Sequence, residues 1–182
     1  MKNQSRDMTI DSTGYNWRLG ELVSLKWNVK LIKKSSRNSY AYYAVSHYIC
    51  VREATEGQCG ILVKVLGKIS KEHIMFVNGE PYCKDEREDL FKGKCYYSYP
   101  FPTVDALKEV LEIVSSNEAL KGRLEAESMN LNPASSFWIR EAAGNFLTKK
   151  PQYYDAGSGQ ICKATDNTAH YRLTIAYFSK NE

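Results

Sequence analysis

Apolar and polar residues alternate over several segments in the first hundred residues of the chain. Between residues 25 and 31, every second residue is apolar, and the residues between them are lysine or asparagine. A period of two is typical of a β-strand that places one face on a core and the other in water. Residues 40–52 follow a short basic connection and are rich in aromatic and β-branched types. We therefore expect these two segments to pair as a β-hairpin.

Shorter segments with strand character follow. Residues 61–65, 73–77 and 95–101 carry β-branched or aromatic side chains, and so do residues 171–177 near the end of the chain. Asn78-Gly79 comes directly after one of these segments and suits the positive φ angles of a tight turn. This pattern predicts a second hairpin in the first half of the chain.

The glycine-rich segment 155–159 superficially resembles a nucleotide-binding loop. Such a loop precedes a helix, whose free N–H groups face the phosphates. Here residues 160–163 have strand character, and the remaining chain is shorter than the roughly 30 residues that a βαβ unit needs. We therefore expect a hairpin that joins residues 153–154 to residues 161–162.

The apolar period changes after Pro102. From residue 104 to residue 114 the apolar positions recur at helical spacing, and Thr103 stands before them as an N-cap. Ser115, with a glutamate three residues later, forms a capping-box pattern. This pattern predicts a second helix that ends at about Met129.

Asn132-Pro133 has the pattern of an N-cap followed by proline at the first helical position. It predicts a third helix that passes through Trp138 and ends near Gly144. Strands before and after a group of helices predict an α+β fold. We expect an antiparallel, hairpin-rich sheet of about six to eight strands, with two to three helices inserted before the last strands and packed on one face.

The length and composition are those of one globular domain. The 182 residues are 43% hydrophobic and 25% charged, which suits a packed core. Residues 1–13 are polar and aperiodic, so we expect a flexible tail there and a single domain at residues 14–182. The five cysteines are an odd number without a close pair, no apolar run follows Met1, and no segment reaches the ~20 apolar residues of a membrane span. These features favour a cytoplasmic protein without membrane contact.

Motifs of catalysis and metal binding are sparse. Cysteines and histidines do not occur at the spacings of a structural zinc site, so we expect no metal and no cofactor. His47 shares a strand face with apolar residues, which favours a core position. His170 stands near Asp166 at the entrance to the last strand, and this pair is the candidate for acid–base chemistry in a small hydrolase or transferase. Because no Gly-x-Ser-x-Gly motif accompanies it, a non-enzymatic function is favoured over an enzymatic one.

Tyrosine and lysine supply the remaining signal. The chain has 13 tyrosines and a net charge of +4. Tyrosine has an apolar body and a polar tip, and it suits both half-buried sheets and interfaces. A basic and aromatic group at the first hairpin has the chemistry to bind phosphates and to stack on bases. This group consists of Lys26, Lys30, Lys33, Lys34, Arg37, Tyr40 and Tyr42.

Three functional hypotheses follow from these residues. The preferred one is a non-catalytic module that binds a protein partner through a tyrosine-rich sheet surface. The first alternative is the binding of a nucleotide or a single-stranded nucleic acid at the basic first hairpin. The second alternative is an enzyme that uses His170 and Asp166. The sequence leaves the partner, any substrate and the oligomeric state undefined.

Overall fold

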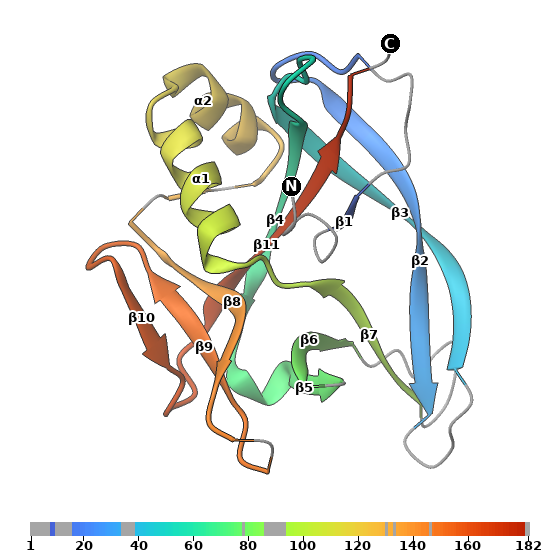
Figure 1. Cartoon of the computed structure of the whole chain (residues 1–182), viewed down its shortest axis with the longest axis vertical. Coiled ribbons are helices and arrows are strands. Elements are labelled where there is room, and N and C mark those ends of the chain that lie inside the picture. Colours follow the sequence, from blue (N-terminus) through green and yellow to red (C-terminus); the bar gives the residue numbers. More distant parts are fainter. Residues whose placement is uncertain are drawn as a thin grey trace.

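The computed structural model describes residues 8–9, 16–33, 39–77, 79–85, 94–129, 131–132, 134–145 and 147–180. For residues 8–9, 26–33, 39–45, 77, 84–85 and 94–100 it describes the backbone alone. Eleven strands form one continuous sheet in this part of the chain (Figure 1). The strands are β1 (Met8–Thr9), β2 (Leu22–Lys33), β3 (Ser39–Arg52), β4 (Gly60–Ile69), β5 (Ile74–Val77), β6 (Glu80–Asp85), β7 (Lys94–Pro100), β8 (Ser136–Ala143), β9 (Lys150–Asp155), β10 (Gln160–Lys163) and β11 (His170–Phe178).

The sheet is mostly antiparallel and rich in hairpins. Its spatial order is β10-β9-β8-β11-β4-β3-β2-β7-β6-β5, and β1 pairs with β11. The hairpins predicted from sequence join β2 to β3, β5 to β6 and β9 to β10. The predicted α+β class with an antiparallel sheet is therefore confirmed, although the described strands outnumber those predicted.

The last strand of the chain lies in the middle of the sheet. β11 pairs antiparallel with β4 and parallel with β8, and Figure 1 shows it crossing the molecule between them. Met8 and Thr9, inside the predicted tail, pair parallel with Ala176 and Tyr177 of the same strand. The two ends of the described chain thus meet at one strand.

Two α-helices lie between β7 and β8. They are α1 (Val104–Ser115) and α2 (Glu118–Ala126), and a short 3-10 turn, η1 (Lys71–His73), precedes β5. Thr103 is confirmed as the N-cap of α1, because its hydroxyl accepts from the N–H of Ala106 at 3.3 Å. Neither α1 nor α2 is long and apolar enough to cross a bilayer.

The predicted start of the second helix is wrong by two residues. Asn117 is its N-cap and accepts from the N–H of Leu120, whereas Ser115 ends α1 and donates its hydroxyl to the carbonyl of Glu112. Both serine and asparagine suit an N-cap, so the spacing of the capping box alone selected the wrong one.

The predicted third helix is a strand. Asn132 caps a turn, in which its side chain accepts from the N–H of Ala134, and β8 then begins at Ser136. The apolar run Phe137, Trp138 and Ile139 is buried on both faces of the sheet, at 0–1% exposure. A strand that is covered on both faces has a continuous apolar run, which periodicity does not separate from a buried helix.

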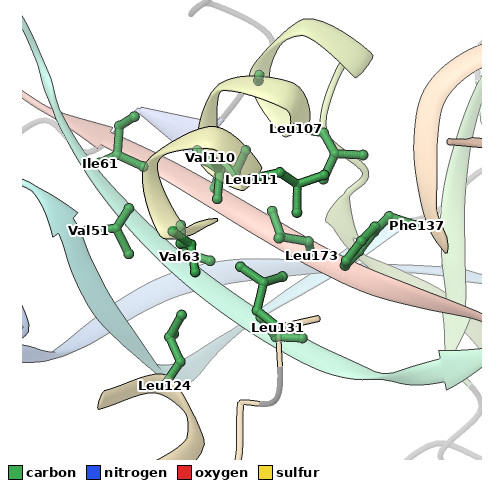
Figure 2. Packing of buried hydrophobic residues seen from close by; sticks show 14 of the residues in the cluster. Val51, Ile61, Val63, Leu107, Val110, Leu111, Leu124, Leu131, Phe137 and Leu173 are labelled. Carbon is green, nitrogen blue, oxygen red and sulfur yellow. The ribbon is translucent and has the colours of Figure 1, made fainter. Parts of the chain in front are cut away.

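The helices bury one face of the sheet. Figure 2 shows Leu107, Val110 and Leu111 of α1 against Val63 and Leu173 of the central strands. The opposite face of the same strands is also covered, since a second cluster there contains Tyr48, Cys50, Leu62, Ala176 and Phe178. Trp17 packs edge-on against Phe178 with ring centroids 4.9 Å apart. The two helices therefore pack on one face, while the centre of the other face is closed by a second apolar layer.

Candidate functional site

His170 begins β11 and lies beside the first residue of β8. Its side chain is 4% exposed, and its Nδ1 lies 2.5 Å from the hydroxyl oxygen of Ser136. The two residues are 34 positions apart in the chain, and the parallel pairing of β8 with β11 brings them together. The structure therefore gives the predicted His170 a serine partner that the sequence did not indicate.

Two aromatic rings hold the imidazole of His170 in place. The ring of Tyr153 stacks on it with centroids 3.7 Å apart and an interplanar angle of 17°. The ring of Trp138 meets it edge-on at 4.9 Å, and the Trp138 indole N–H donates to the carbonyl of Ile69 at 2.9 Å. We call Ser136, Trp138, Tyr153 and His170 the His170 cluster. The stacked and edge-on rings of this cluster constrain the plane of the imidazole.

Burial keeps the imidazole of His170 neutral. Desolvation lowers its pKa below the ordinary value, Lys68 acts in the same direction, and the carboxylates of Asp166 and Asp155 oppose both. In the tautomer protonated at Nε2, the Nδ1 atom accepts the hydroxyl proton of Ser136. The pair thus has the arrangement of a base and a hydroxyl that it can deprotonate.

Asp166, the predicted acidic partner, is exposed and acts on His170 through its charge. Its carboxylate accepts from the backbone N–H of Thr168 at 2.9 Å. Hydrogen bonds from the side chain and backbone of Thr168 lower the pKa of Asp166, so the carboxylate is charged at neutral pH. The predicted pairing of His170 with Asp166 is therefore electrostatic, and the hydrogen bonds of Asp166 are made within its own loop, to Thr168.

Cys162 lies next to this cluster on β10. It is the cross-strand partner of Tyr153 and is partly exposed. Burial raises the pKa of the Tyr153 phenol, and the neighbouring Cys162 adds to that rise. The phenol is consequently a neutral hydrogen-bonding group at physiological pH.

The other face of the same four strands carries a row of apolar side chains. In the pairing registers Ile161 lies opposite Tyr154, Tyr154 opposite Phe137, and Phe137 opposite Tyr171. We call these four residues the aromatic row. Phe137 is fully buried, Tyr154 and Tyr171 are partly exposed, and Ile161 is 46% exposed at the edge strand. The row therefore runs from the core to an open surface.

Two exposed lysines cover the tyrosines of the aromatic row. The Lys108 ammonium, from α1, lies 5.4 Å from the ring centroid of Tyr154. The Lys68 ammonium, from β4, lies 4.8 Å from the ring centroid of Tyr171. Both distances are those of cation–π contacts. Lys163, two residues after Ile161 on β10, is also exposed. This face is therefore basic as well as aromatic.

The predicted basic and aromatic group at the first hairpin lies mostly outside the described side chains. Lys26, Lys30 and Lys33 are on β2, and Tyr40 and Tyr42 are on β3, with their backbones alone described. Lys34 and Arg37 lie outside the described residues. In the backbone register Tyr40 and Tyr42 lie opposite Leu31 and Val29, whereas Lys26 and Lys30 lie opposite Val45 and Ala41.

The predicted core position of His47 is wrong. Its side chain is exposed, and its Nδ1 lies 2.7 Å from the hydroxyl of Ser24 on β2. The apolar cluster under the helices contains Ile49 and Val51 from the same strand face and does not extend to His47. Side chains alternate between the two faces of β3, as the sequence predicts. How far the helices extend along the strand depends on the tertiary structure, and they do not cover His47.

The N-terminus of α1 borders a polar pocket of about 360 Å³. Glu141 occupies this helix end, because both of its carboxylate oxygens lie 3.0 Å from the N–H of Val104. Glu80 and Asp105 also line the pocket. The N–H groups of Val104 and Ala106 are thus already hydrogen-bonded, to Glu141 and to Thr103, which disfavours a further anionic ligand at this helix end.

The sequence signals for these two faces were weak. Tyr153-Tyr154 indicated a strand, but only the register shows that one tyrosine joins the His170 cluster and the other the aromatic row.

Among the described residues, no group of three or more His, Cys, Asp or Glu side chains is placed to hold a metal ion. No family model, no curated protein and no solved structure matches this chain.

Proposed function

We propose that this chain is a protein-binding module whose aromatic row receives an acidic segment of a partner. The observation that supports the proposal is the placement of Lys68 and Lys108 over Tyr171 and Tyr154. Tyrosine is favoured in protein interfaces, and the lysines supply a charge complementary to aspartate and glutamate. The exposed Ile161 adds an aliphatic contact at the end of the row.

A protein partner fits this surface better than a single-stranded nucleic acid does. Base stacking needs open ring faces, and here lysine ammonium groups already lie over the rings of Tyr154 and Tyr171. Phe137, between them, is fully buried and offers no face to a base. Acidic side chains, in contrast, gain contacts with the two lysines without displacing them from the rings.

A fluorescent peptide of alternating glutamate and aromatic residues tests the proposal directly. Each lysine contact with such a peptide is expected to contribute about 0.5–1 kcal/mol, so the double variant Lys68→Glu/Lys108→Glu should weaken binding about five- to thirtyfold. The measurement is fluorescence anisotropy at low ionic strength. The matched control is Lys121→Glu/Lys180→Glu, which has the same net charge but changes lysines away from the row.

The outcomes separate the alternatives. A loss confined to the first double variant supports the proposal. Equal losses in the two variants, or no binding by the unmodified protein, would contradict it. If oligo(dT) binds instead, and the Lys68/Lys108 variant alone abolishes that binding, the row is a nucleic-acid interface and the protein-binding proposal fails.

A further inference from the structure

The described part of the chain contains two serine–histidine pairs of different character. Ser24 and His47 are both exposed and 2.7 Å apart across the β2–β3 hairpin. Ser136 and His170 are 2.5 Å apart, with a partly buried serine and a histidine that is 4% exposed. Water competes for every hydrogen-bonding group of the first pair, whereas the second imidazole is shielded by Tyr153 and Trp138. The second pair is therefore the more shielded of the two.

The surroundings of His170 suit a general base. A base must be unprotonated before the reaction and must accept a proton during it. Burial keeps the imidazole neutral beforehand, and the carboxylates of Asp166 and Asp155 favour the imidazolium that forms on proton transfer. In known triads a histidine base activates the serine and a carboxylate hydrogen-bonded to the histidine supports it, whereas here Asp166 and Asp155 act on His170 through their charge.

We propose that Ser136 is a nucleophilic serine, activated by His170, which accepts acyl groups from small carboxylic esters. The Ser136 oxygen attacks the ester carbonyl while its proton moves to Nδ1 of His170. The carbon–oxygen bond to the leaving alcohol breaks, and that alcohol takes the proton from the imidazolium. Water then hydrolyses the acyl-serine by the same proton transfers and releases the carboxylic acid, so that the enzyme returns to its starting state.

Ser136 is more exposed than the histidine that it contacts. It is the first residue of β8, directly after a turn whose Ala134 is exposed, and its own side chain is partly exposed. The histidine lies behind it in the cluster. The turn of the β9–β10 hairpin adjoins this position, because Ala156 donates its N–H to the carbonyl of Ser135.

A fluorophosphonate tests the nucleophile without knowledge of the natural ester. Its phosphorus forms a bond to the serine oxygen, fluoride leaves, and the serine proton passes to the histidine. Intact-mass spectrometry should show one adduct on the unmodified protein, and fragment masses should place it on Ser136. Ser136→Ala should lose the adduct, whereas the matched control Ser24→Ala should keep it. The labelling rate should rise with pH with a midpoint below about 6.5, the ordinary histidine value.

Other results would overturn the proposal. They are the absence of an adduct on the unmodified protein, an adduct on Ser24, or labelling of Ser136→Ala at the unmodified rate. Hydrolysis of p-nitrophenyl acetate supplies a second measurement, and it should fall to the uncatalysed rate in Ser136→Ala. Peptide binding at the aromatic row should be the same in Ser136→Ala and in the unmodified protein, so this proposal and the binding proposal stand or fall separately.

Discussion

His170 shows how burial changes the chemistry of a single residue. Its pKa is lowered in the folded protein, chiefly by desolvation, while the unfolded chain has the ordinary value of about 6.5. Below that pH the unfolded state binds more protons than the folded state, so the free energy of unfolding decreases as the pH falls. Above about pH 6.5 both states carry a neutral imidazole, and this contribution is constant.

Urea unfolding at a series of pH values between about 7.5 and 5.5 checks this sign. The expected slope that His170 adds is at most about 1.4 kcal/mol per pH unit. His170→Asn should reduce the loss of stability at acid pH, because it removes the group whose pKa burial lowers. An equal pH dependence in the unmodified protein and in His170→Asn would show that burial of His170 does not determine the effect.

At the scale of elements, α2 ends in a backbone geometry that serine does not favour. Ser128 has a φ of 59°, and the N–H groups of Ser128 and Met129 donate to the carbonyls of Glu125 and Leu124. These two bonds are those of a Schellman motif, whose left-handed position is usually glycine. The apolar Met129 follows and is buried at 7% exposure. The end of α2 therefore has the hydrogen bonds of a Schellman motif, with Ser128 in the strained left-handed position.

Ser128→Gly should consequently stabilise the protein. Glycine removes a left-handed strain of about 1–2 kcal/mol and costs about 0.5–1 kcal/mol of backbone entropy, which leaves a gain of up to about 1.5 kcal/mol. The measurement is the free energy of unfolding in urea. Gly122→Ala, inside the same helix with no atom beyond the local helix backbone within 4 Å of the added Cβ, is a matched test of helix propensity. A loss of stability in Ser128→Gly would contradict this account of the helix end.

The elements also show where local patterns succeed. Thr103 precedes α1 in sequence and caps it in space, because an N-cap acts within three residues of itself. The Val77–Glu80 turn carries Gly79 at a φ of 82°, which suits the glycine found there. The prediction of a helix at β8 is wrong because the continuous apolar run of this strand results from burial on both of its faces. The segments that bury it lie far away in the chain.

At the scale of the whole molecule, the fold depends on its final strand. β11 pairs with β4, β8 and β1, so its removal would separate the β8–β10 strands from the rest of the sheet and take the buried Leu173 and Ile175 out of the core. A chain that ends at residue 169 should therefore lack cooperative unfolding in urea and a dispersed amide NMR spectrum. A chain that ends at residue 178 should retain both, since Ser179 and Lys180 are exposed. A cooperative transition in the shorter chain would contradict this dependence.

Residue types and their spacing along the chain determined the α+β class, the hairpins and the start of α1. These features depend on contacts within a few residues, and such contacts are visible as period, caps and turn types. The pairing of β8 with β11 was decided by the tertiary structure alone. That pairing places Ser136 against His170 on one face and Phe137 against Tyr171 on the other. Both proposed sites join residues from strands that are distant in sequence. The strand register and the packing of distant segments bring those residues together, and no local sequence pattern encodes either.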